Sequence, residues 1–192
     1  ASETNTFHSV GDCGNGWVSP NMTSGGKCVS GSAITAGYRF SNVTITQGNY
    51  IYSATMDFYH SYGGAYALNV KNRVYASKVS NLSTFSNGNL PSNVTKTTAY
   101  ADWNSVSSSG NSGWFSTSTE PPPTVTSLIQ EVVNQGTWTS GNALGLILTD
   151  NGSSNDWWFA VKAYEDGSST AAKLTINYGS TQPNYYNGLI DE

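Results

Sequence analysis

The sequence is poor in charge and in long apolar runs, and each shortage excludes a class of protein. Only 10% of its 192 residues are charged, with eight Lys and Arg against twelve Asp and Glu, whereas an average domain has about 25%. The basic residues are scattered singly and form no patch that could follow phosphates, so we expect no nucleic-acid partner. No run approaches the ~20 apolar residues that a spanning helix needs, so we expect no membrane span.

Catalytic and metal-binding motifs are also scarce. The two histidines, His8 and His60, stand in no H-E-x-x-H motif, and there is no G-x-S-x-G nucleophile elbow. Asp57 lies on the opposite face of its strand from His60 if side chains alternate. We therefore expect a non-catalytic protein without a cofactor. Asp150 and Asp156, in DNGSSND, are weak calcium candidates, because their spacing matches no EF-hand and the Asn-Gly pair favours a hairpin turn.

Neutral side chains take the place of charge. Gly, Ser, Thr and Asn are abundant, and 12% of residues are aromatic, which separates the chain from disordered proteins of high charge and few aromatics. This composition favours a secreted or cell-surface protein. The only two cysteines, Cys13 and Cys28, then predict a disulfide, which would contribute ~3 kcal/mol for a loop of about 15 residues. The alternative is a pair of reduced thiols in a cytosolic protein.

Five asparagines stand in Asn-x-Ser/Thr sequons. They are Asn21, Asn42, Asn81, Asn93 and Asn151. Because Asn, Ser and Thr are so frequent, this number is close to the chance expectation. The sequons therefore permit N-glycosylation without demonstrating it.

Most segments alternate apolar and polar residues. The alternation is clear in residues 52–60, 66–76, 97–103 and 172–178, while 143–149 is more continuously apolar. In the first of these, Tyr52, Ala54, Met56 and Phe58 share one face. Several short alternating segments predict an all-β protein, an antiparallel β-sandwich of jelly-roll-like form, with 143–149 as a central strand covered on both faces.

One segment has a helical period instead. In TSLIQEVVNQG (126–136), apolar residues recur four positions apart, which predicts a short amphipathic helix near residues 126–135. Ser127 and Gln130 are spaced for a capping box, and Gly136 can end the helix. Residues 105–124, rich in Ser, Gly and Pro, form a long loop before it.

The order of these segments resembles a known module. AGYRFSNVTITQGNYIYSATMDF (36–58), VTKTTAYADW (94–103), VTSLIQEVVNQGTWTSGNALGLILTDNGSS (125–154) and AYEDGSSTAAKLTINY (163–178) carry the resemblance. It is similar to DNRLRE-type, disaggregatase-related domains of secreted and surface bacterial proteins, over about residues 35–178. The resemblance implies a non-catalytic extracellular β-sandwich and supplies no active site. We accordingly divide the chain into residues 1–34, an arm and disulfide loop; 35–178, the module; and 179–192, an extended tail.

Aromatic residues within the module suggest a polysaccharide partner. Alternation in DWWFAVKAYE (156–165) places Trp158 and Tyr164 on the polar face, about 20 Å apart along a strand. Trp114, in the long loop, is a third ring that could join this glycan platform. The alternative is that these large side chains are buried under neighbouring loops.

The two ends of the chain suggest self-association. The tail PNYYNGLIDE follows a segment that already looks like a closing strand. It can link to a further domain, fold back on its own sandwich, or add to the sheet of a neighbour. The third interpretation predicts a structural subunit of a surface filament or adhesive assembly, with a carbohydrate-binding module of a larger protein as the alternative. The residues predicted to form the intersubunit strand are Phe7 and Val10, or Tyr186, Leu189 and Ile190.

Overall fold

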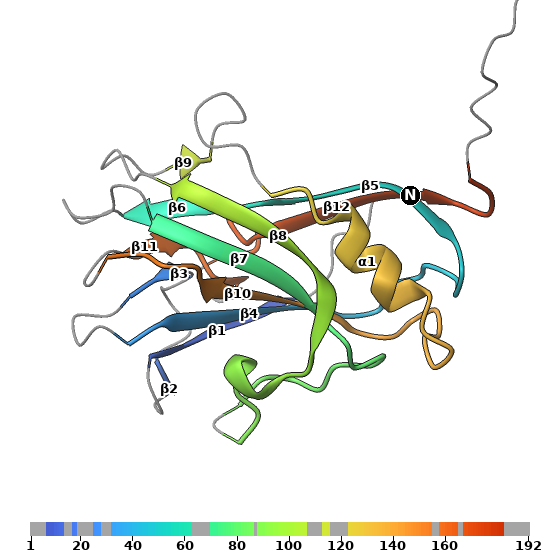
Figure 1. Ribbon diagram of the computed structural model, residues 1–192, viewed down its shortest axis with the longest axis horizontal. Helices are drawn as coiled ribbons and strands as arrows, with labels where there is room; N and C mark the ends of the chain where they lie inside the picture. Colours follow the sequence, from blue (N-terminus) through green and yellow to red (C-terminus); the bar gives the residue numbers. More distant parts are fainter. Residues whose placement is uncertain are drawn as a thin grey trace, which may run out of the picture.

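The computed structural model describes residues 7–13, 17–18, 25–27, 32–62, 70–86, 88–106, 113–115, 123–154, 158–164 and 167–182. The elements in chain order are β1 (Phe7–Cys13), β2 (Trp17–Val18), β3 (Gly25–Gly26), β4 (Ile34–Phe40), β5 (Tyr50–Asp57), β6 (Tyr59–Tyr62), β7 (Val70–Ser77), η1 (Pro91–Asn93), β8 (Lys96–Val106), β9 (Gly113–Trp114), α1 (Thr126–Val133), β10 (Leu144–Asp150), β11 (Trp158–Val161) and β12 (Lys173–Gly179). All strand pairings among these elements are antiparallel. The prediction of an all-β, sandwich-like fold with one short helix is confirmed (Figure 1).

The larger sheet forms one layer of the sandwich. Its strand order is β2-β1-β4-β10-β7-β8. Tyr38, Leu146 and Ala76 stand opposite one another across three adjacent strands, and all three are buried. The central position of β10, between β4 and β7, confirms the prediction that residues 143–149 form a covered strand.

The second layer is built around one nearly continuous run of chain. β5 and β6 are separated only by Phe58 and lie end to end in Figure 1. β12 pairs with β5, and β11 pairs with β6. On the other side of β5, the N–H of Val125 donates to the Ala54 carbonyl (2.8 Å) and the N–H of Met56 to the Pro123 carbonyl (3.4 Å).

The layers meet in a core rich in aromatic rings. Phe58 stacks on Trp103 with centroids 5.0 Å apart, and Tyr38 meets Phe58 edge-on at 5.2 Å. The rings of Phe115 and Phe159 approach Trp103 at 5.2 and 5.3 Å. Edge-to-face contacts of this kind add to the burial energy of the rings.

The alternation predicted for β5 fails at one residue. Ala54, Met56 and Phe58 are buried as expected, but Tyr52 is 44% exposed. The cause is a β-bulge, because the register of β12 with β5 shifts between Asn177 and Tyr178. Tyr52 is the extra residue, which has no partner on β12, and the bulge turns its side chain to the outer face.

A separate apolar cluster covers the outer face of the larger sheet. It consists of Leu82, Phe85, Val94 and Ile147. The loop that carries it lies directly on the backbone at Gly37, where a Cβ atom would come within 2.5 Å of the Phe85 ring and 2.8 Å of Pro91. Only glycine permits this close approach.

The N-terminal region differs from the expectation of an unattached arm. β1 pairs with β4 along its whole length, from Phe7 opposite Phe40 to Cys13 opposite Ile34. Pairing satisfies backbone groups that β4 would otherwise expose at an edge. Phe7 and Val10, predicted for an intersubunit strand, therefore belong to a strand of the chain's own sheet. The predicted boundary after residue 34 would separate this strand from the sheet that it joins.

Several predicted features lie outside the described residues. They are Cys28 of the predicted disulfide, the sequon at Asn21, the calcium candidate Asp156, and Tyr186, Leu189 and Ile190 of the tail. Within the described part of the chain, no helix has the length and apolar character required to cross a membrane.

The close packing at Gly37 gives a stability test. We expect Gly37→Ala to lower the free energy of unfolding by about 1–3 kcal/mol, because the new methyl group overlaps the buried ring of Phe85 and the ring of Pro91. Gly136→Ala is the matched control, since no atom lies within 4 Å of its Cβ position. Urea denaturation of both variants checks this, and equal stability of the two would contradict the packing.

Candidate functional site

α1 lies where an edge of each layer would otherwise be open (Figure 1). Its apolar residues Leu128, Ile129, Val132 and Val133 are buried in the core. Because these apolar residues are buried, the polar residues of the helix lie against the strands on either side. The helix thereby brings side chains to the backbone of β5 and of β8.

On the β5 side, Gln130 acts as a clamp. Its Oε1 accepts the N–H of Ile51 (2.8 Å), and its Nε2 donates to the Asn49 carbonyl (3.0 Å). Thr126 Oγ1 accepts the N–H of Ala54 (2.9 Å). The predicted capping box is therefore wrong: the residue before the helix is Val125, no side chain caps the N-terminus, and Gln130 bonds a neighbouring strand instead.

On the β8 side, Glu131 takes the equivalent role. Its two oxygens accept the N–H groups of Thr98 (3.0 Å) and Ala99 (2.8 Å), and Lys78 Nζ lies 3.5 Å away. β8 is the edge strand of the larger sheet. A register shift opposite Tyr75 and Ser77 turns two successive amides toward the carboxylate.

The protonation of Glu131 reflects this environment. Burial raises the pKa of the carboxyl group, but the hydrogen bonds from Ala99 and Thr98 and the nearby Lys78 outweigh that effect. The net pKa lies below the ordinary value of 4.5. Hydrogen bonds to the charged form account for the direction.

β12 is a long strand whose far edge has no partner among the described residues. The edge strands β2, β3 and β9 have two residues each, whereas β12 has seven and pairs with β5 alone. β8, with eleven residues, is the other long edge strand, and Glu131 covers two of its amides. The backbone of Ala54 and Met56 points away from β12, toward residues 123–126. Their partners Ile176 and Leu174 are thus in non-hydrogen-bonded pairs, and direct their N–H and C=O groups to the open edge.

Tyr52 holds the end of β12. The hydroxyl of Tyr52 donates to the carbonyl of Thr181 (2.9 Å), and its ring lies over Gly179. Tyr52 belongs to β5, on the side of β12 away from the open edge. Tyr52 thus fixes the end of β12 to β5.

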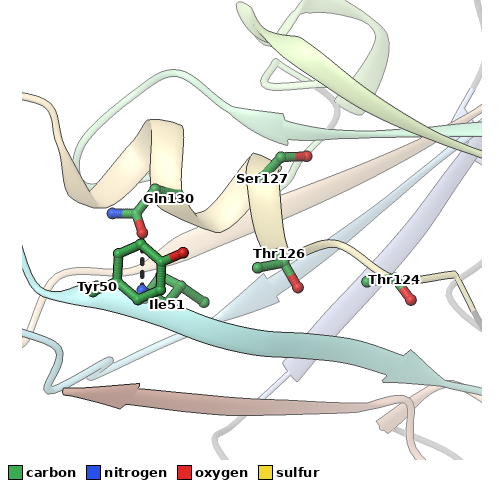
Figure 2. A pocket seen from close by; sticks show the side chains of 6 residues that line it. All are labelled: Tyr50, Ile51, Thr124, Thr126, Ser127 and Gln130. Atoms are coloured by element: carbon green, nitrogen blue, oxygen red, sulfur yellow. Dashed lines mark hydrogen bonds between the residues drawn. The ribbon is translucent and has the colours of Figure 1, made fainter. Parts of the chain in front are cut away.

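A pocket of about 340 Å³ lies between α1 and β5. Its lining comprises Tyr50, Ile51, Thr124, Thr126, Ser127 and Gln130 (Figure 2). These six residues offer hydroxyl groups, one amide and one phenol ring, and none of them is charged.

The predicted glycan platform is not a single exposed surface. Trp114 is 39% exposed, but Lys173 Nζ lies 3.9 Å over its ring and Tyr59 meets it edge-on at 5.5 Å. Trp158 is half-buried on β11, opposite Gly26. Tyr164 is half-buried against the core, because β11 ends at Val161 and the alternation cannot be extended beyond it.

Asp150 is engaged in a turn. Its carboxylate accepts the N–H groups of Gly152 (3.1 Å) and Ser153 (3.0 Å), and Lys27 lies 4.0 Å away. No cluster of metal-ligating side chains occurs in the described part of the chain. The turn interpretation is supported, but the turn connects β10 and β11, which lie in different sheets and do not form a hairpin.

Four sequons fall on described residues near the surface. Asn42, Asn81 and Asn93 are exposed and Asn151 is half-buried. Asn81 Oδ1 accepts the N–H of Ala143 (2.9 Å), and Asn151 Nδ2 donates to Asn104 Oδ1 (3.3 Å). Their glycosylation stays a prediction.

His60 and a nearby polar pair lie inside the fold. His60 is 4% exposed and its ring packs against Phe115 at 5.5 Å. Asn72 and Trp103 stand opposite each other on β7 and β8, and the Asn72 amide and Trp103 Nε1 have no protein partner among the described residues. Alternation places Asn72 on the inner face, but nothing in the sequence distinguishes it from a surface asparagine.

No family model and no curated protein matches this chain. The resemblance to DNRLRE-type modules therefore stays a prediction.

The contact between Glu131 and β8 predicts a pH-dependent contribution to stability. A carboxyl whose pKa is lowered by folding stabilises the fold above its unfolded pKa, and this contribution disappears as the pH falls through the folded value. We expect Glu131→Gln to cost about 1–3 kcal/mol at neutral pH, since its NH2 group cannot accept the second amide. The deficit should shrink on acidification below the ordinary value of 4.5. Unfolding free energies of both proteins across this range check it, and a constant deficit would contradict it.

Proposed function

We propose that this chain is a non-catalytic structural subunit that assembles outside the cell by strand addition. In this assembly, the tail at 183–192 of one copy pairs with β12 of the next. The observation that supports this best is the open edge of β12. An extended peptide placed there would complete main-chain hydrogen bonds that no described segment of the chain completes.

The edge is suited to an added strand. Leu174 and Ile176 are each 6% exposed, so their side chains anchor β12 in the core while their backbone groups face outward. The solvent-facing side chains of β12, such as Thr175 and Asn177, include no acidic group. A strand laid along this edge would therefore meet a rigid template with little charge to oppose it.

The tail is a better donor than the N-terminal segment. β1 is already paired with β4, so Phe7 and Val10 would have to leave their own sheet to join another. The tail contains Tyr186, Leu189 and Ile190, which supply apolar side chains for a neighbour. The bond from Tyr52 to Thr181 fixes the point from which the tail starts.

A tail-to-edge contact determines the symmetry of the assembly. The donor and acceptor surfaces are different, so each copy has one of each and the contact is head-to-tail. Such a contact gives a ring if the rotation closes and a filament if it does not. The low net charge of -4 suits close contact between identical copies, because a larger charge of one sign would make them repel.

Truncation tests the proposal. We expect the full chain to form filaments or large oligomers by mass photometry and negative-stain microscopy, and the chain ending at Gln182 to be monomeric. Deletion of residues 1–6 is the matched control, because it leaves β1 intact and should preserve assembly. Circular dichroism establishes that each variant is folded. A monomeric full chain, or assembly that survives loss of the tail, would contradict the proposal.

A further inference from the structure

The pocket between α1 and β5 is separate from the open edge of β12, because the two lie on opposite sides of β5. Figure 2 shows Tyr50 below Gln130 and the hydroxyl-bearing residues Thr124, Thr126 and Ser127 along the helix and the segment that leads into it. Any ligand recognised here contacts side chains that take no part in strand addition.

The walls of this pocket are held in place. The side-chain amide of Gln130 is hydrogen-bonded to the backbone of Ile51 and Asn49, and its Nε2 also donates to Asn134 Oδ1 (2.9 Å). Thr126 Oγ1 already accepts the N–H of Ala54. These bonds fix the shape of the pocket before a ligand arrives, which lowers the entropic cost of binding.

The groups left for a ligand are hydroxyls. No described hydrogen bond uses the side-chain oxygens of Tyr50, Thr124 or Ser127, and the Thr126 hydroxyl retains its proton for donation. Each hydroxyl can both donate and accept. A set of this kind matches a ligand that itself carries several hydroxyl groups.

The described lining does not favour charged ligands. Its six residues include no Lys, Arg, Asp or Glu, so an anion or a cation would lose its hydration without gaining a counter-charge from them. A purely apolar ligand would leave the hydroxyl groups without partners, which is also costly. The chemistry therefore favours a neutral polyhydroxylated molecule.

The ring of Tyr50 lines the pocket, and the ring of Tyr52 stands next to it. The rings of Tyr50 and Tyr52 are 5.6 Å apart, and Tyr52 is 44% exposed but held by its bond to Thr181. A ring with an apolar face and a polar end can pack on the C–H face of a sugar while its hydroxyl reaches water or the ligand. The volume of about 340 Å³ lies at the small end for ligand pockets.

From these features we infer that the pocket binds one ring of a neutral sugar, with Tyr50 packing on the ring and Ser127 bonding one of its hydroxyls. This site differs from the predicted platform of Trp114, Trp158 and Tyr164. It does not depend on the proposed function, since a monomer would carry it as well.

Titration of the full chain with glucose, galactose and mannose tests the inference, with glucuronate as the charged probe. We expect at least one neutral hexose to give saturable shifts in the amide signals of Ile51, Ser127 and Gln130 in 1H–15N spectra. Glucuronate should bind at least tenfold more weakly than that hexose. If the assembled chain is too large for such spectra, isothermal titration calorimetry measures the same affinities.

Two substitutions separate a site from a general surface effect. Ser127 is exposed, so Ser127→Ala keeps the fold and should weaken binding by about threefold to tenfold. Tyr50→Ala should weaken it by more. Ser83→Ala and Tyr100→Ala, at exposed positions elsewhere, are the matched controls and should leave the affinity unchanged.

Three results would overturn the inference. The first is that no neutral hexose gives a saturable response. The second is that glucuronate binds as well as the neutral sugars. The third is that Ser127→Ala and Tyr50→Ala bind as the parent chain does, which would place the sugar elsewhere.

Discussion

The structure depends on how its sheet edges find hydrogen-bond partners. Two neighbouring residues of one helix meet this need on one side: Gln130 accepts an amide of β5, and Glu131 accepts two amides of β8. The apolar face of α1 is buried between them, so burial of the helix and capping of the edges support each other. On the opposite side no helix performs this task for β12 in the described part of the chain, which leaves the edge open for a partner.

The two proposed sites follow from the same helix. By clamping Ile51 and Ala54, α1 leaves the space between itself and β5 that forms the hydroxyl-lined pocket. By pairing with the backbone of Ala54 and Met56, the segment before α1 sets which amides of β5 remain for β12. This choice determines which residues of β12 bond to β5. It leaves the backbone groups of Leu174 and Ile176 directed outward. Sugar recognition and assembly are thus expected at opposite sides of one strand.

Local patterns in the sequence predicted much of the fold, and long-range pairings explain what they missed. Alternation located β5, β7, β8 and β12, and the four-residue spacing located α1, because burial on one face leaves a period in the sequence. A continuous apolar run located β10. The exposure of Tyr52 was missed, since a bulge depends on the partner strand. The partners of Gln130 and Glu131 were missed because they lie far away in sequence, and so was the pairing of β1 with β4. Of the pocket, only Ser127 and Gln130 had been singled out, and for a different role.

Amide hydrogen exchange along β12 tests the central claim most directly. In the chain ending at Gln182, the account predicts alternation: the amides of Thr175 and Asn177, which face β5, exchange slowly, and those of Leu174 and Ile176 exchange fast. In the assembled full chain, quenched and dissolved before measurement, all four should exchange slowly. Leu174 and Ile176 amides that are protected without the tail, or that stay fast in the assembly, would contradict it.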